Sequence, residues 1–302
     1  MKALFLDCND QLAPVWRHVV RADDPPIDVN REAFASDELP AVLDGYAIAI
    51  DDHSYMPTPQ IERCPALKHI VFLGTGPASY MSLADMAARG IAVHIIKGYG
   101  DTAVAEHTVA LLFAACRDIA RMDREVRAGT WTPHAGVQLL GKTLGVIGLG
   151  GIGSEVLRIG KGLGMEAIAW NRTPKAGAPL VALDELLARS DVISMNLTLT
   201  DETRGFLGPP QFARMKPGVI FVNTARAGLV DETAFIAALR SGRIRHAGLD
   251  VFHHEPLKPD NALARLNNVT LTAHAAFRTP EASMTLLRRA IDIVRDIVAG
   301  KA

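Results

Sequence analysis

Three side chains in the second half of the sequence have the chemical types that acid–base work on a small organic anion requires. Arg226 lies in NTARAG, Glu255 in DVFHHEP and His274 in LTAHAA. A guanidinium binds a carboxylate and polarises a carbonyl, and an imidazole exchanges a proton near neutral pH. A carboxylate beside the imidazole favours its protonated form and fixes which ring nitrogen faces the substrate. The set suits the reduction of a 2-keto acid, with His274 as acid in reduction and as base in oxidation.

Each of these side chains also has an ordinary structural interpretation, as a surface ion pair, a solvated loop carboxylate or a hydrogen-bonded histidine. The position of all three favours a shared site, because each follows an apolar run with the look of a buried strand: GVIFVN, AGLDV and VTLTA. In an open parallel sheet, ligands bind outside the carboxyl ends of the strands. His253 and His254 adjoin Glu255 but lack the spacing of a metal motif, so we expect no metal site.

A glycine motif in TLGVIGLGGIGSE, residues 143–155, predicts a dinucleotide site. Gly148, Gly150 and Gly153 have the spacing G-x-G-x-x-G. The first permits a tight turn, the second lets the backbone approach a pyrophosphate, and the third lets the next helix pack closely on the strand. The alternative is an ordinary strand–turn–helix corner. The apolar run before the motif, the helical pattern after it and the second strand AIAW, residues 167–170, favour the dinucleotide site.

The end of AIAW predicts which dinucleotide is preferred. NAD-specific proteins of this fold carry Asp or Glu there, to accept hydrogen bonds from the ribose hydroxyls. This sequence has Asn171, Arg172 and Thr173 instead, and Lys175 follows. These groups can donate hydrogen bonds to a 2′-phosphate or pair with its charge, whereas a carboxylate would repel it. We therefore expect NADP to be preferred and NAD to remain possible, and the alternative is a solvated Arg172 in an enzyme that takes either.

The elements that must position these residues form a doubly wound α/β pattern. Short apolar runs at 2–7, 46–50, 69–74 and 91–96 predict parallel strands buried on both faces in a first domain. Alternating strand and helix patterns follow the glycine motif, and a last apolar helix is expected at 281–298. The longest helical pattern, 101–121, is so apolar that it is covered either within the monomer or by a second subunit.

Composition limits the classes of partner and setting. The 302 residues allow two domains, 49% are hydrophobic, and the formal net charge is -1, so we expect no nucleic-acid and no membrane partner. Cys8, Cys64 and Cys116 are scattered and form no C-x-x-C pair. Such cysteine usage, with no signal peptide, indicates a reducing cytoplasm.

Four motifs, in the order VIGLGGIG, NTARAGLVDE, GLDVFHHEPL and LTAHAAFRTPEA, resemble the D-isomer-specific 2-hydroxyacid dehydrogenase family, in particular its glyoxylate and hydroxypyruvate reductases. The resemblance covers nearly the whole chain. It implies two doubly wound, Rossmann-like domains, with the cofactor domain (100–275) inserted into a substrate domain made of 1–99 and a returning helix in 276–302. It also implies Arg226, Glu255 and His274 as the catalytic set, and a homodimer.

The resemblance further assigns binding residues. It implies that the substrate contacts the backbone of Gly74, Thr75 and Gly76 besides Arg226 and His274, although Thr75 can equally belong to a plain glycine turn. With the glycine motif, it gives this expected cofactor-binding set: Gly148, Gly150, Gly151, Ile152, Gly153, Asn171, Arg172, Thr173, Thr224, Ala225 and Asp250, the last near the nicotinamide. The sequence departs from the family at Ala273, commonly Pro, and at 275–277, where Ala-Ala-Phe replaces a glycine-containing continuation.

The leading hypothesis is an NAD(P)-dependent reductase that converts small 2-keto acids of the glyoxylate and hydroxypyruvate type to D-2-hydroxy acids. One alternative is activity of the phosphoglycerate dehydrogenase type, which would want several basic groups near the pocket. Another is a non-catalytic protein that binds the dinucleotide and reports redox state to a partner.

Overall fold

The structure is a computed structural model in which residues 1–301 are described, and they form two compact units. The first unit contains the residues up to Gly100 and those from Arg278 onward, and the second is Asp101–Phe277. Each unit has its own parallel sheet with helices, so the predicted fold class is confirmed. The expected boundaries, after residues 99 and 275, lie close to these, and the roles assigned to the two units stay predictions.

The first unit has a five-stranded sheet in the order β2-β1-β3-β4-β5. Its strands are β1 (Ala3–Phe5), β2 (Ile27–Val29), β3 (Ile48–Asp51), β4 (His69–Phe72) and β5 (Ala92–Ile95). Sequence analysis missed β2, because its three residues are partly or fully exposed and show no apolar run. The expectation that the run at 91–96 is buried on both faces is wrong, because β5 pairs only with β4 and its residues are exposed or half-buried.

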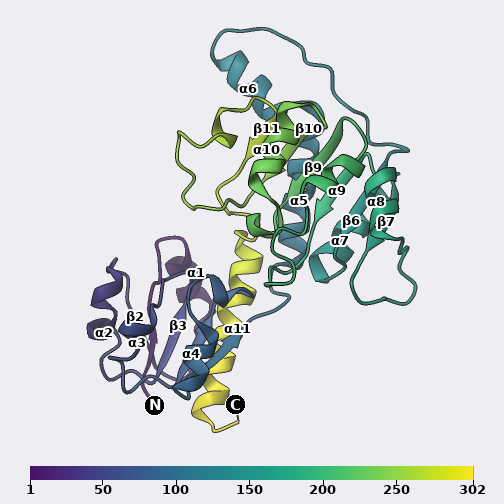
Figure 1. Ribbon diagram of the computed structural model, residues 1–302. Helices are drawn as coiled ribbons and strands as arrows, with labels where there is room; N and C mark the ends of the chain where they lie inside the picture. The colour runs from purple at the N-terminus through teal and green to yellow at the C-terminus, as the bar shows by residue number, and fades with distance from the viewer. Residues whose placement is uncertain (302) are drawn as a thin grey trace. The chain divides into compact units, whose positions relative to one another are not determined.

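The helices of this unit are α1 (Leu12–Val19), α2 (Leu39–Val42), α3 (Thr58–Ile61), α4 (Leu83–Ala88) and α11 (Pro280–Val298), with short 3-10 turns at Ser36–Glu38 and Pro77–Ser79. Although α11 ends the described chain, it packs against α1 and β4, as Figure 1 shows in yellow beside the purple N-terminal elements. Its periodic apolar face buries Leu286, Leu287, Ile291 and Val294. Arg288 on the same helix donates two 2.8 Å hydrogen bonds to the Asp24 carboxylate.

The second unit has a six-stranded parallel sheet in the order β11-β10-β9-β8-β6-β7. The strands are β6 (Thr143–Ile147), β7 (Glu166–Trp170), β8 (Val192–Met195), β9 (Val219–Asn223), β10 (Ile244–Leu249) and β11 (Val269–Leu271). Because β7 and β8 flank β6 on opposite sides, the strand order reverses at β6. The loop after β6 carries the glycine motif and therefore lies at the switch point, where ligands bind in such sheets.

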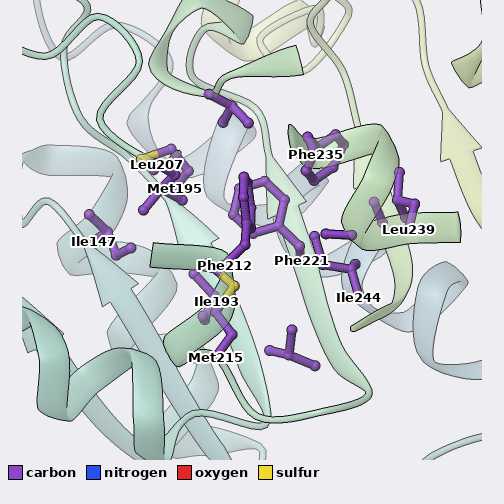
Figure 2. Close-up of a cluster of buried hydrophobic side chains, with 14 of the residues drawn as sticks. Ile147, Ile193, Met195, Leu207, Phe212, Met215, Phe221, Phe235, Leu239 and Ile244 are labelled. Atoms are coloured by element: carbon purple, nitrogen blue, oxygen red, sulfur yellow. The ribbon is translucent and has the colours of Figure 1, made fainter. Parts of the chain in front are cut away.

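Helices cover both faces of this sheet. They are α5 (Asp101–Arg117), α6 (Ile119–Arg127), α7 (Gly151–Gly162), α8 (Leu183–Arg189), α9 (Pro209–Arg214) and α10 (Glu232–Arg240), with 3-10 turns at Ala227–Leu229 and Leu263–Arg265. Alternation along β9 sends Phe221 into the core shown in Figure 2, with Phe212 and Phe235. Ile220 and Val222 enter the opposite core, under α5 and α7.

The apolar pattern at 101–121 is not one helix, and that expectation is wrong. Asp118 adopts a left-handed backbone with φ 51°, which ends α5 at Arg117 and starts α6 in a new direction. Leu111 and Leu112 on α5 are buried within the unit, because α5 packs on α7, β9 and β10. Among the described helices, none is both long and apolar enough to cross a membrane.

Candidate active site

The glycine motif forms the turn between β6 and α7. Gly148 has φ +95°, a conformation that side chains rarely adopt, and a Cβ there would lie 2.8 Å from the carbonyl oxygen of Asn196. At Gly153 a Cβ would lie 1.9 Å from the carbonyl oxygen of Gly148, so only glycine lets α7 approach the strand this closely. A Cβ at Gly150 would meet nothing within 4 Å. This open backbone at a helix N-terminus fits the pyrophosphate of a dinucleotide.

The end of β7 is tied to this turn by hydrogen bonds. Asn171 accepts from the Leu149 N–H at 3.0 Å and donates to the Thr173 carbonyl at 2.7 Å, so both ends of its amide are engaged. Lys175 Nζ lies 2.9 Å from Ser154 Oγ, at the start of α7. Positive charge therefore lies beside the glycine turn.

Arg172 has a partner that sequence analysis missed. Its Nη1 lies 2.5 Å from Glu202 Oε2, and both side chains are more than two-thirds exposed, at 72% and 76%. Glu202 follows β8 and is 30 residues away in the sequence, so inspection of the end of β7 alone did not find it. A carboxylate is thus present beside the predicted ribose-binding residues, although no residue from 171 to 173 supplies it.

Arg226, Glu255 and His274 follow β9, β10 and β11, and the fold brings them together. His274 Nδ1 lies 2.6 Å from Glu255 Oε2, and the two side chains are about a quarter and a third exposed, at 26% and 32%. The other carboxylate oxygen of Glu255 accepts the Phe252 N–H at 2.8 Å. The Arg226 charge is close enough to lower the pKa of Glu255.

The electrostatics keep Glu255 ionised. Burial raises the pKa of this carboxyl, but the hydrogen bonds from His274 and the Phe252 N–H, together with the nearby charges of His274 and Arg226, outweigh burial and hold the pKa below its ordinary value. An ionised Glu255 that accepts from Nδ1 orients the imidazole, so that proton exchange with a substrate is left to Nε2. His253 and His254 are exposed in the same loop.

Two buried polar residues, Asn223 and Thr224, fix the loop after β9 by hydrogen bonds. Asn223 accepts from the Ala225 N–H at 2.9 Å and donates to the Arg226 carbonyl at 3.0 Å, which sets the backbone that carries the guanidinium. The hydroxyls of Thr224 and Thr108 are 2.7 Å apart, which links this loop to α5. Sequence analysis missed Thr108, because it counted that residue as part of an apolar stripe.

Asp250 at the end of β10 is fully buried, at 0% exposure, and the chain after β11 folds around it. Its carboxylate accepts the backbone N–H groups of Ala275 at 3.0 Å and Ala276 at 2.9 Å. Burial raises its pKa, but the nearby His107 imidazole and the hydrogen bonds from Thr272 and these two N–H groups outweigh burial and hold the pKa below the ordinary value.

His274 itself has φ 48°, a left-handed backbone that costs a residue with a side chain about 1–2 kcal/mol. Its N–H donates to the Asp250 carbonyl at 2.9 Å. The site therefore holds a strained histidine in one conformation, a feature that is common where geometry matters for function.

The first unit carries the predicted substrate loop, Gly74–Gly76, at the carboxyl end of β4. The Ile96 N–H donates to the Gly74 carbonyl at 3.0 Å, which links the loop to the end of β5. The ends of β1 and β3 in the same unit carry Asp7, Asp51 and Asp52. Of the described residues directly after β1, β3 and β4 (6–11, 52–57 and 73–79), none is Lys or Arg.

Comparison with known proteins agrees with this architecture. Residues 109–276 match the family described as D-isomer specific 2-hydroxyacid dehydrogenase, NAD binding domain. Glycerate dehydrogenase of Methylorubrum extorquens is 36% identical over 89% of this chain and 88% of its own length. Glyoxylate reductase of Aeropyrum pernix is 42% identical over 79% of this chain and 75% of its own. The apo D-lactate dehydrogenase of Escherichia coli superposes with a TM-score of 0.88 at 28% identity, over 100% of this chain and 98% of that one.

Other relatives are longer. The chain spans about half the length of curated D-3-phosphoglycerate dehydrogenases, such as that of Archaeoglobus fulgidus, which is 40% identical over 83% of this chain and 49% of its own length. With two parallel α/β units, a dinucleotide-type glycine turn and a family match over more than half of its residues, the chain belongs to the D-isomer specific 2-hydroxyacid dehydrogenase family.

Proposed function

We propose that the protein is an NAD(P)H-dependent reductase of small 2-keto acids that forms D-2-hydroxy acids. The observation that carries the proposal is the 2.6 Å contact of His274 Nδ1 with Glu255, beside Arg226, at the carboxyl ends of adjacent strands in the unit that carries the glycine turn. Family membership supports the reaction class. The bound nicotinamide would supply the hydride, and the glycine turn and the end of β7 would hold the dinucleotide.

Each residue of the set has a distinct task in this proposal. The Arg226 guanidinium binds the substrate carboxylate and polarises the keto group. His274 donates a proton from Nε2 to the carbonyl oxygen in reduction and takes it back in oxidation. Glu255 orients the imidazole through its contact with Nδ1. Asp250 holds the backbone on both sides of His274.

The test is oxidation of NADPH and NADH by the purified protein with glyoxylate, hydroxypyruvate, pyruvate and phosphohydroxypyruvate. His274→Ala should leave cofactor affinity nearly intact and lower kcat by about 10²- to 10⁴-fold, the range for a lost general acid. Unchanged turnover in that variant would refute the role of His274. A wild-type protein that binds dinucleotide but reduces no substrate of the panel would favour the alternative, a dinucleotide-sensing binding protein.

Among these substrates we propose glyoxylate and hydroxypyruvate over phosphohydroxypyruvate. The support is the ends of β1, β3 and β4, where Asp7, Asp51 and Asp52 gather and residues 6–11, 52–57 and 73–79 include no Lys or Arg; Arg31 and Lys97 follow the outer strands β2 and β5. A phosphate group needs cationic partners. The names of the relatives that align over most of their own length, glycerate dehydrogenase and glyoxylate reductase, agree with this choice.

We also propose NADPH as the preferred cofactor. The support is the absence of a carboxylate at residues 171–173 and the presence of Arg172, with Lys175 beside the glycine turn. A charge-assisted contact to the 2′-phosphate is worth roughly 1–3 kcal/mol. Glu202 opposes this preference, because it already pairs with Arg172.

The two residues make opposite predictions for the ratio of kcat/KM with NADPH to kcat/KM with NADH. Arg172→Ala should lower the ratio, and Glu202→Gln should raise it, because the guanidinium is then released from its carboxylate. If kcat/KM were equal with both cofactors in the wild type, or if Arg172→Ala lost no kcat/KM with NADPH, Arg172 would not recognise the 2′-phosphate.

A homodimer remains our proposal for the quaternary state. The stripe on α5 that suggested it is largely covered within the second unit, but large apolar side chains stay exposed at the end of α5 and beyond. They are Phe113 at 39%, Ile119 at 50%, Val126 at 51% and Trp131 at 86%. Figure 1 shows α6 and the segment after it at the margin of this unit, and exposed apolar side chains on such a segment fit a self-complementary interface.

A further inference from the structure

The turn that carries His274 depends on one buried carboxylate. The N–H groups of Ala275 and Ala276 point at the two oxygens of Asp250, and the His274 N–H donates to the Asp250 carbonyl. The residue before His274 is Ala273, so no proline ring restrains the chain there. The left-handed conformation of His274 therefore rests on the orientation of the Asp250 side chain.

The orientation of that side chain is fixed by a chain of hydrogen bonds that leads to α5. Thr272 donates its hydroxyl to Asp250 Oδ1 at 2.6 Å. His107 Nε2 lies 3.0 Å from the Thr272 oxygen and 3.6 Å from Asp250 Oδ1. Because the Thr272 proton is used on Asp250, the Thr272 oxygen accepts from His107, which assigns the His107 proton to Nε2.

We infer that His107 is a positioning residue for His274, acting through Thr272 and Asp250. The inference rests on the proposed function, because His274 is the proton donor there. His107 lies on α5, which packs against β10 and β11, so a long helix supports the turn that carries His274. Without the His107 donor, Thr272 and the Asp250 carboxylate can rotate, and the two N–H groups after His274 lose a fixed acceptor. A displacement of a reacting group by about 1 Å can lower the rate by about 10²-fold.

The second unit contains a matched control on β10 and β11, the two strands that precede Asp250 and Thr272. His246 on β10 makes the same kind of contact, with Nε2 3.0 Å from Thr270 Oγ1 and Nδ1 3.0 Å from Asp118 Oδ1. It is buried, at 2% exposure, and among the described residues its two ring nitrogens contact Thr270 and Asp118, not the groups that hold the His274 turn. Loss of His246 should therefore lower stability without changing the geometry at His274.

The experiment compares His107→Leu, His107→Gln and His246→Leu with the wild type. In His107→Leu we expect kcat to fall by about 10- to 100-fold while the Kd for NADPH, measured by fluorescence titration, changes less than about threefold. His107→Gln keeps a donor near Nε2 and should recover kcat to within a few-fold. His246→Leu should lose thermal stability and keep kcat.

Hydrogen exchange gives a readout that does not need turnover. The amides of Ala275 and Ala276 should exchange faster in His107→Leu than in wild type or in His246→Leu, at matched global stability. The inference would be overturned if these amides exchanged at the wild-type rate in His107→Leu, or if His246→Leu lost as much kcat as His107→Leu. If the wild-type protein reduced no 2-keto acid and exchange still rose only in His107→Leu, the proposed reaction would fail while the brace on the turn would stand.

Discussion

Asp51→Asn is expected to stabilise the first unit at neutral pH, because Asp51 and Asp7 share a proton. Asp7 accepts the backbone N–H groups of Asp52 at 2.8 Å and His53 at 3.0 Å and the Ser54 hydroxyl at 2.7 Å, so both of its oxygens act as acceptors. Asp51 accepts only the Ser54 N–H, at 3.0 Å, and its Oδ2 is buried with no donor among the described residues. The proton therefore belongs on Asp51.

Burial, with the neighbouring charge of Asp7, raises the pKa of Asp51 well above its ordinary value. Burial is also the largest cause of the raised pKa of Asp7. The folded chain thus keeps a proton that the unfolded chain releases above about pH 4, so stability falls as pH rises from about 4 to the folded pKa. One proton that only the folded chain binds gives a slope of about 1.4 kcal/mol per pH unit across the pH range between the unfolded and folded pKa values. An asparagine amide donates as the acid does and cannot ionise, so the variant should lose this slope.

The assay is urea unfolding between about pH 5 and pH 8, followed by the fluorescence of Trp16. Trp16 is buried in the first unit, 5.1 Å from the Phe5 ring, and replacing Trp131 and Trp170 by Phe leaves it as the single reporter of the three tryptophans. Asp7→Asn is the matched control and should destabilise, because an amide cannot accept all three hydrogen bonds. If the free energy of unfolding changed with pH in the same way in the wild type and in Asp51→Asn, the shared proton would be refuted.

Three further predictions test other parts of the molecule. Gly153→Ala should weaken NADPH binding by about tenfold, because the new Cβ meets the Gly148 carbonyl and overpacking costs about 1–3 kcal/mol; an unchanged Kd in fluorescence titration would contradict this. Asp24→Ala should cost about 3 kcal/mol in urea unfolding at neutral pH, because Arg288 loses its buried partner. That cost should shrink as pH falls toward the Asp24 pKa of about 2, because the wild-type carboxylate is then protonated and the wild type loses the ion pair as well. A difference in free energy of unfolding that stayed constant with pH would argue against the ion pair. Trp131→Ser should lower the mass measured by light scattering from dimer to monomer, and a monomeric wild type at micromolar concentration would rule out the homodimer.

Much of the fold was predictable from the sequence, because buried parallel strands leave short apolar runs and glycine spacing encodes a turn. The run at 192–195 coincides with β8, and Gly148 and Gly153 make the close approaches that the motif requires. The break at Asp118 was not predictable, because neither glycine nor proline marks it. The exposed edge of β5 was missed for a related reason, since an apolar run does not say which strands end a sheet.

The candidate site was predictable where chemistry follows a strand directly, and not where partners meet from distant parts of the chain. Arg226, Glu255 and His274 each follow their own strand, and the order of the strands brings them together. His107 was hidden within an apolar helical stripe, and Glu202 reaches Arg172 from the following loop. Such contacts depend on the register of packed elements, which side-chain periodicity alone does not specify.

The return of α11 to the first unit has a consequence for biosynthesis. The second unit is one continuous stretch of chain, Asp101–Phe277, whereas the first is closed by its two ends. On the ribosome the second unit can complete its core while the first still lacks its last helix. Until α11 emerges, the apolar surface that it covers on α1 and β4 is exposed to water, which makes this intermediate a target for chaperones. The order of synthesis thus makes the first unit the last to mature.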